Sequence, residues 1–114
     1  MNAVSADGNE LTIDGTRLVF DDEIGGVVQI ESGAVVRLEI PPEKTCNRNV
    51  IAINNDGTIR WRIPEAPDGS SGDKPYMDIY LQDGELWAGN WICYCYRIDQ
   101  DTGELLEREF EGRM

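Results

Sequence analysis

Residues 49–63 read NVIAINNDGTIRWRI, and this stretch decides the fold class. Apolar and polar residues alternate on both sides of a central Asn-Asp-Gly at positions 55–57. Alternation with a period of two is typical of a strand with one buried face, and Asn or Asp followed by Gly favours a tight hairpin turn. The stretch therefore predicts a β-hairpin with strands at residues 49–54 and 58–63.

The same pattern continues on both sides of this hairpin. Short alternating segments are joined by turns that contain glycine, and Pro41-Pro42 ends one of them because proline cannot donate to a sheet. Residues 103–113 are the one candidate helix, but the hairpin turn before them favours a strand. We expect strands at residues 11–13, 17–20, 27–31, 34–40, 49–54, 58–63, 76–82, 85–90, 91–98 and 104–110.

Strict alternation also assigns the side chains of each strand to two faces. The strand at 91–98 carries apolar or aromatic residues on both faces, so we expect it to be central and covered on both sides. The pattern places Ile59, Trp61 and Ile63 on the inward face of one strand, and Met77, Ile79 and Leu81 on one face of another.

These segments predict a single all-β domain over residues 1–114, built as an antiparallel meander of about ten short strands. A length of 114 residues suits one domain. The 40% of hydrophobic and 28% of charged residues are typical of a globular chain that buries a core.

Two segments resemble each other: the stretch at 49–63, and ICYCYRIDQDTGELLEREF at 92–110, with a shorter copy at 11–20. Each contains an apolar strand, an Asn or Asp, a turn with Gly and a second strand. This spacing resembles the inner hairpin of quinoprotein-type (PQQ-like) β-propeller repeats, over about two repeats from residue 27 to residue 110. The matching residues are Ala52, Asn54, Gly57 and Trp61 in the first copy, and Asp99, Thr102 and Gly103 in the second.

The resemblance implies two propeller-blade-like sheets. The second copy departs from the repeat, because Glu107 stands where the repeat has Trp and Arg97 where it has Ala. A propeller usually closes with about four to eight blades. We therefore expect the two sheets to pack as a small sandwich or barrel, with assembly of several chains into a ring as the alternative. No cofactor is carried over, because the family's quinone site needs a full ring.

The chain carries 22 Asp and Glu residues against 10 Lys and Arg residues, for a net charge of −12. Nucleic acids and anionic membranes bind positive surfaces, so we expect direct binding to neither. Only Lys44 and Lys74 are lysines, and this composition resembles that of haloarchaeal proteins. Molar salt reduces the Debye length to about 3 Å, which stops neighbouring carboxylates from repelling each other. An ordinary acidic protein and an acidic mimic of the DNA backbone are the alternatives.

The first ten residues, MNAVSADGNE, contain neither the basic nor the apolar segment of a secretory signal. Apolar runs are far shorter than the roughly 20 residues of a membrane helix, so we expect a cytoplasmic protein. Cys46, Cys93 and Cys95 are an odd number, and we interpret them as reduced thiols that pack in the core. With no histidine and no fourth cysteine, no metal site is expected.

The residues that commonly carry catalysis are largely missing. The chain lacks histidine, a phosphate-binding glycine loop and a G-x-S-x-G nucleophile turn, which disfavours an enzyme. A carboxylate-based enzyme is the alternative, and it would need a pair such as Asp78 and Asp99 in a cleft. We interpret the acidic residues around Gly103 as a hairpin turn, because the full ligand set of a calcium loop is absent.

Aromatic residues are concentrated in the second half of the chain. Tyr and Trp combine a large contact area with a polar group, which suits a surface that binds a partner. Two arginines expected on one strand face could hold a carboxylate or phosphate. We therefore favour a non-catalytic binding or protein-interaction module, as a homo-oligomer or with another protein. Its expected surface combines the loop at 64–75 with Tyr76, Tyr80, Trp87, Trp91, Arg60 and Arg62.

Overall fold

The computed structural model describes residues 4–66, 75–90 and 94–110, which form eleven β-strands and no helix. This confirms the all-β prediction, and every pair of neighbouring strands is antiparallel. The strands are β1 (Val4–Asp7), β2 (Glu10–Ile13), β3 (Thr16–Val19), β4 (Glu23–Ile30), β5 (Gly33–Glu39), β6 (Val50–Asn54), β7 (Ile59–Arg62), β8 (Tyr76–Gln82), β9 (Glu85–Asn90), β10 (Tyr94–Ile98) and β11 (Leu105–Phe110).

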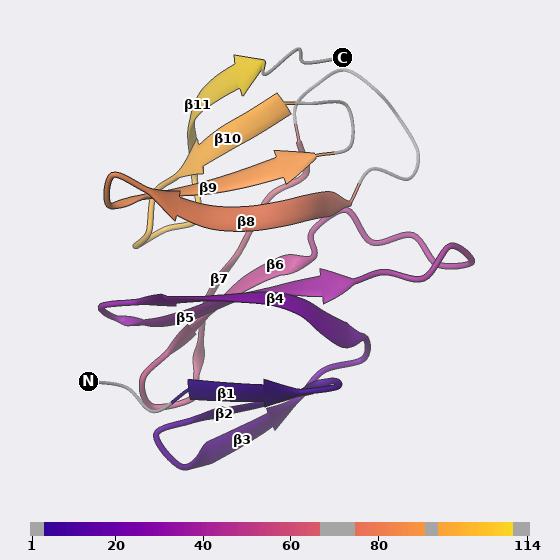
Figure 1. Ribbon diagram of the computed structural model, residues 1–114, viewed down its shortest axis with the longest axis vertical. Coiled ribbons are helices and arrows are strands. Elements are labelled where there is room, and N and C mark those ends of the chain that lie inside the picture. Colours follow the sequence, from indigo (N-terminus) through magenta and orange to yellow (C-terminus); the bar gives the residue numbers. More distant parts are fainter. Residues whose placement is uncertain (1–3, 67–74, 91–93, 111–114) are drawn as a thin grey trace.

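The strands form three sheets, and Figure 1 shows them stacked one above the other. We call them the N-terminal sheet (β1-β2-β3), the middle sheet (β4-β5-β6-β7) and the C-terminal sheet (β8 to β11, in the order β11-β10-β9-β8). Each sheet is a meander, because sequential strands are neighbours within it. The two four-stranded sheets pack as the predicted small sandwich, and the N-terminal sheet adds a third layer.

The middle sheet packs against another sheet on each face, because β5 carries apolar side chains on both of its faces. Val36 and Leu38 belong to a core shared with Leu11 and Ile13 of the N-terminal sheet. Val35 belongs to a second core, which extends to the C-terminal sheet. The buried members of this second core on the C-terminal sheet are Tyr76, Ile79, Leu86, Ala88, Tyr96 and Ile98.

Two polar side chains also join the middle sheet to the C-terminal sheet. Asn49, just before β6, is fully buried and hydrogen-bonds both backbone polar groups of Tyr76. The indole N–H of Trp61 in β7 donates to the carbonyl oxygen of Gln100, in the turn between β10 and β11, at 2.9 Å. The second contact joins the two segments that the sequence marks as similar.

The turns follow the sequence closely. Asp14 and Asp83 each adopt a positive φ, of 46° and 53°, as the first residue of a two-residue Asp-Gly loop. In the Asn-Asp-Gly turn, hydrogen bonds from the hydroxyl and backbone N–H of Thr58 lower the pKa of Asp56 below its usual value. The turn between β4 and β5 differs from the prediction, because its loop is Glu31-Ser32 and glycine 33 already pairs with Ile30.

Extra, unpaired residues overturn two of the predicted face assignments. In β7, Trp61 pairs with Ala52 and Ile59 pairs with Ile53, so the residue between them, at position 60, has no partner. This extra residue places Ile59 and Trp61 on opposite faces of the sheet. Ile59 is therefore 63% exposed, although alternation places it inward. Met77 is the corresponding extra residue of β8, and it is 50% exposed, while Tyr76 and Ile79 share the core.

One strand starts well before its predicted position, and one strand is additional. Strand β4 begins at Glu23, four residues before the expected start, because an irregularity between Ile24 and residue 26 lets the two glycines remain in the sheet. Strand β1 was not expected, since its sequence VSAD has little apolar alternation. It forms because β2 offers a neighbouring edge with which it pairs over four residues.

Candidate functional site

The outer face of the C-terminal sheet carries a row of large side chains. In the strand register, Tyr80 of β8 lies beside Trp87 of β9, which lies beside Arg97 of β10 and then Glu107 of β11. Paired residues share one face of a sheet, and Tyr96 and Ile98 place the core on the other face. We call this set the aromatic–arginine row.

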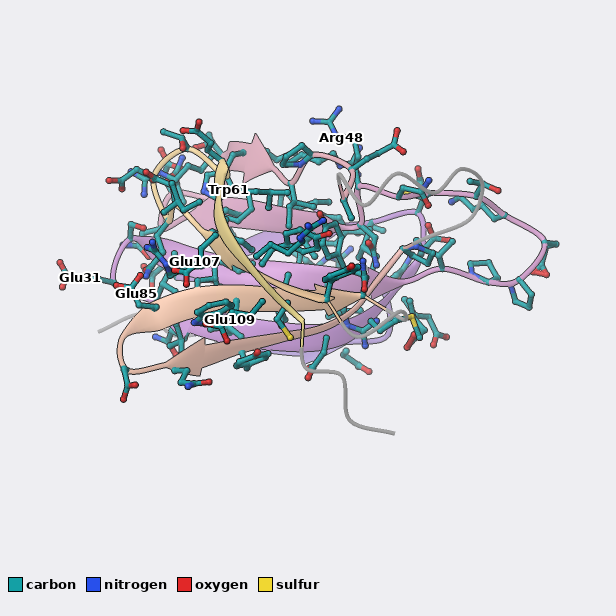
Figure 2. All side chains as sticks on the ribbon, turned by 90° about the horizontal axis from the view of Figure 1, so that it is seen from above. Glu31, Arg48, Trp61, Glu85, Glu107 and Glu109 are labelled. Carbon is teal, nitrogen blue, oxygen red and sulfur yellow. The ribbon has the colours of Figure 1, made fainter. Side chains whose placement is uncertain are left out.

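Two carboxylates hold the arginine of this row in place. Arg97 Nε lies 3.0 Å from Glu107 Oε1, and Nη1 lies 3.2 Å from Glu85 Oε2. The hydrogen bond to Glu107, with a further contribution from Glu85, raises the pKa of Arg97 above its usual value. Figure 2, which looks down on this sheet, shows Glu85 and Glu107 over its strands together with Glu109. The row is thus an ordered surface with aromatic and charged character.

The structure brings together only part of the predicted binding surface. Tyr80 is half-buried and lies in the row. Trp87 also lies in the row, but it is buried, with only 8% of its surface exposed. Tyr76 is a correction, because it is fully buried in the core and its hydroxyl donates to the Pro64 carbonyl oxygen. Trp91 and most of the predicted loop, residues 67–74, lie outside the described residues.

Arg60 and Arg62 do not share a face as predicted. Arg60 is the unpaired residue of β7, and its guanidinium lies 3.9 Å from Asp101 in the turn between β10 and β11. Arg62 pairs with Ile51 and lines a cavity beside the N-terminal sheet. The two arginines therefore cannot hold one ligand together.

The predicted carboxylate pair is also separated. Asp78 pairs with residue 89, near the end of β9. Asp99 lies near the start of β9, because the preceding residue, Ile98, pairs with Leu86. Asp99 Oδ1 accepts hydrogen bonds from the backbone N–H groups of Asp101 and Thr102, so it supports the turn. Across the described ranges, no group of three or more Cys, Asp or Glu side chains is placed to hold a metal ion.

The cysteines that the structure describes occupy different environments. Cys95 of β10 is buried, with 6% exposure, as expected, but it pairs with Glu109 on the outer face of the C-terminal sheet. Cys46 is half-buried and lines the cavity beside Arg62. Cys93 lies outside the described residues.

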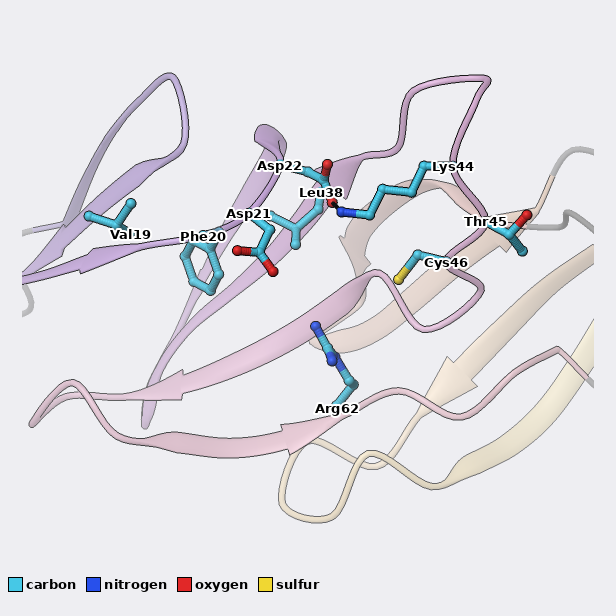
Figure 3. A pocket seen from close by; sticks show the side chains of 9 residues that line it. All are labelled: Val19, Phe20, Asp21, Asp22, Leu38, Lys44, Thr45, Cys46 and Arg62. Carbon is cyan, nitrogen blue, oxygen red and sulfur yellow. Dashed lines mark hydrogen bonds and ion pairs between the residues drawn. The ribbon is translucent and has the colours of Figure 1, made fainter.

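The cavity beside Arg62 has a volume of about 330 Å³ and is shown in Figure 3. We call it the Arg62 cavity. One ion pair crosses its rim, where Lys44 Nζ lies 2.7 Å from Asp22 Oδ2 and this hydrogen bond raises the pKa of Lys44. Sequence reasoning did not identify the site, although the scarcity of lysine had singled out Lys44. The lining residues are Val19, Phe20, Asp21, Asp22, Leu38, Lys44, Thr45, Cys46 and Arg62.

Comparison with known protein families assigns the chain to one family. A family model described as a domain of unknown function, DUF7957, matches residues 1–110. The chain belongs to the DUF7957 family. The match spans the aromatic–arginine row and the Arg62 cavity, so both lie within the DUF7957 domain. No curated protein matches the chain. Within the described part of this DUF7957 domain, no helix has the length and apolarity needed to cross a membrane.

Proposed function

We propose that this chain is a non-catalytic interaction module that binds a second copy of itself through the outer face of the C-terminal sheet. The aromatic–arginine row carries this proposal. It places Tyr80, Trp87 and Arg97 side by side on the last sheet of the stack. Tyrosine, tryptophan and arginine are the residues most enriched among those that dominate the binding energy of protein interfaces.

The C-terminal sheet is the last layer at one end of the molecule, which measures 40 × 34 × 23 Å with its sheets stacked along the longest axis. Its outer face is therefore not covered by either of the other two sheets.

Charge favours a head-to-tail arrangement, in which the C-terminal sheet of one copy packs on the N-terminal sheet of the next. If the C-terminal sheet packed on itself, each of its outer acids would face the same set in the partner, and like charges repel. The outer face of the N-terminal sheet carries fewer acids: it offers an apolar Val19, which is 61% exposed, the pair of Glu10 and Arg17 at 3.5 Å, and one further acid, Asp7, beside Glu10. The acids on the outer face of the C-terminal sheet are Asp78, Glu85, Glu107 and Glu109.

The way the sheets stack supports this arrangement. Strand β8 contacts β4 and β5, and β4 contacts β1, so the first strands of the three sheets lie side by side along one edge (Figure 1). The proposal also uses the resemblance to propeller blades that the sequence around Trp61 and the Asn-Asp-Gly turn indicates. Two copies would supply six sheets, which is within the range of about four to eight blades that closes a ring.

Light scattering coupled to size-exclusion chromatography tests the proposal. In about 2 M KCl, where charge repulsion is screened, we expect twice the 12.8 kDa mass of one chain. Tyr80→Glu and Val19→Glu should each yield the single-chain mass, because each places a carboxylate in the apolar part of the contact. Ile59→Glu is the matched control, since Ile59 is equally exposed but lies on the edge of the middle sheet. A wild-type chain with the mass of one copy at every protein concentration would overturn the proposal.

We also propose that the acidity is an adaptation to a salt-rich cytoplasm. The melting temperature should rise by about 5 °C or more between roughly 0.1 M and 2 M KCl, which corresponds to about 1 kcal/mol. Replacing the exposed Glu31, Glu43 and Glu104 with Gln should reduce this increase, because fewer carboxylates then repel each other at low salt. An unchanged melting temperature in circular dichroism would contradict the adaptation. Salt-sensitive capture of a basic protein would favour the DNA-mimic alternative instead.

A further inference from the structure

The Arg62 cavity is assembled from segments that are far apart in the sequence. Phe20 and Asp21 come from the connection between β3 and β4, Leu38 from β5, and Arg62 from the end of β7. Leu38 is 3% exposed and Phe20 is partly buried, and both belong to the core below the N-terminal sheet. The cavity therefore has an apolar base and charged walls, and its volume of about 330 Å³ lies within the range of small-molecule sites.

The walls are fixed by hydrogen bonds outside the cavity. The backbone N–H and carbonyl oxygen of Phe20 bond to Asn9 at 2.9 and 2.8 Å, and the N–H of Ile24 bonds to the turn between β1 and β2 at 2.8 Å. On the other side, Arg48 Nε donates to the Ile63 carbonyl oxygen at 3.0 Å, which holds the end of β7. A site that is already ordered costs less entropy when a ligand binds.

Two opposite charges face this space without a partner. Within the described ranges, the Arg62 guanidinium forms no hydrogen bond or ion pair, whereas every other described arginine contacts a carboxylate, a backbone carbonyl or an aromatic ring. The Asp21 carboxylate likewise forms neither, and acts on Lys44 only at longer range. Figure 3 shows Asp21 and Arg62 on opposite walls, directed toward each other across the cavity.

We propose that the Arg62 cavity binds a small zwitterion with an apolar body, of the class and size of an aliphatic α-amino acid. Its carboxylate would bind the guanidinium of Arg62, which can donate two parallel hydrogen bonds. Its ammonium group would bind Asp21, and its aliphatic part would contact Phe20 and Leu38. This proposal does not rest on the assembly proposed above, although Val19 belongs both to the lining of the cavity and to the proposed contact between copies.

The charges of the cavity decide among classes of ligand. Lys44 is already neutralised by Asp22, so the remaining charges are one carboxylate and one guanidinium. A simple anion would meet the repulsion of Asp21, and a simple cation that of Arg62. Only a ligand that carries both charges satisfies both walls at once.

Isothermal titration calorimetry of the full chain with L-leucine tests the site. Acetate carries only the carboxylate and isobutylamine carries only the ammonium group. Each should bind at least about tenfold more weakly than L-leucine. Arg62→Gln and Asp21→Asn should each weaken leucine binding about tenfold or more, because each removes one charged hydrogen-bond partner. All titrations should be performed at the same salt concentration, since salt weakens these contacts.

Arg60→Gln is the matched control, because Arg60 lies on the same strand but outside the cavity and should leave leucine binding unchanged. Both Arg62 and Asp21 are exposed, so their variants should keep the wild-type circular dichroism spectrum. The proposal is overturned if the wild-type chain binds leucine no more tightly than acetate. It is equally overturned if Arg62→Gln binds leucine with wild-type affinity.

Discussion

Replacing Asn49 with leucine should destabilise the fold by about 3–5 kcal/mol. The side chain is fully buried and makes three hydrogen bonds to the backbone. Its Nδ2 group donates to the carbonyl oxygens of Leu38 and Tyr76, both at 2.9 Å, and its Oδ1 accepts from the N–H of Tyr76 at 2.8 Å. Leucine has a similar volume but leaves all three backbone groups without this partner. Thermal unfolding should show a melting temperature lower by roughly 10–20 °C.

Two further variants separate hydrogen bonding from packing. Asn49→Asp keeps the shape of the side chain but loses both donated hydrogen bonds and buries a charge, so it should be at least as destabilising at neutral pH. Asn9→Leu removes one hydrogen bond, at 2.8 Å to the Phe20 carbonyl oxygen, in a partly buried position and should cost only about 1 kcal/mol. If Asn49→Leu lost no more stability than Asn9→Leu, Asn49 would not join the two sheets as described.

The fold class could be predicted because its signals are local. Alternation and Asp-Gly turns act between neighbouring residues, and the Asp14 and Asp83 loops adopt the expected geometry. The strand preference over a helix for the last segment is also confirmed, since β11 pairs with β10 through five residue pairs. In contrast, the importance of Asn49 depends on a residue of another sheet, and nothing in its local sequence indicates that contact.

The unpaired residues of β7 and β8 explain the errors in the predicted faces. An extra residue arises from how two strands pair, so the sequence of one strand does not reveal it. Beyond the extra residue the alternation continues in the opposite phase, which moves Ile59 out of the core and lets Tyr76 and Ile79 share it. The same effect separates Arg60 from Arg62, which alternation had placed on one face.

The candidate sites differ in how far the sequence could identify them. Tyr80 and Trp87 were expected at a surface because aromatic residues gather in this part of the chain, and pairing of β8 with β9 brings them together. Arg97 joins them only through the register of β10. The Arg62 cavity is lined by residues from four segments that are distant in the sequence. The sequence therefore gives the charge of each residue but does not show that they lie close together.

Gly103→Ala should destabilise the fold by about 3–5 kcal/mol. Gly103 has a φ of 80°, and an added Cβ would lie 2.7 Å from the Cδ2 and Cε3 atoms of the Trp61 ring. The left-handed backbone alone costs a non-glycine residue about 1–2 kcal/mol. The ring must also move, and this weakens the 2.9 Å hydrogen bond from its N–H to Gln100 and its packing in the core. Urea unfolding, followed by tryptophan fluorescence and circular dichroism, measures the loss.

Gly84→Ala provides the matched control for this contact. Gly84 occupies another hairpin turn of the same sheet with a φ of 79°, but no atom lies within 4 Å of an added Cβ. It therefore carries the backbone cost of about 1–2 kcal/mol without the collision. The difference between the two variants isolates the contact of Trp61 with the turn of the next sheet. Equal losses of stability would mean that this contact contributes little, and that the two similar segments are joined mainly by the apolar core around Val35.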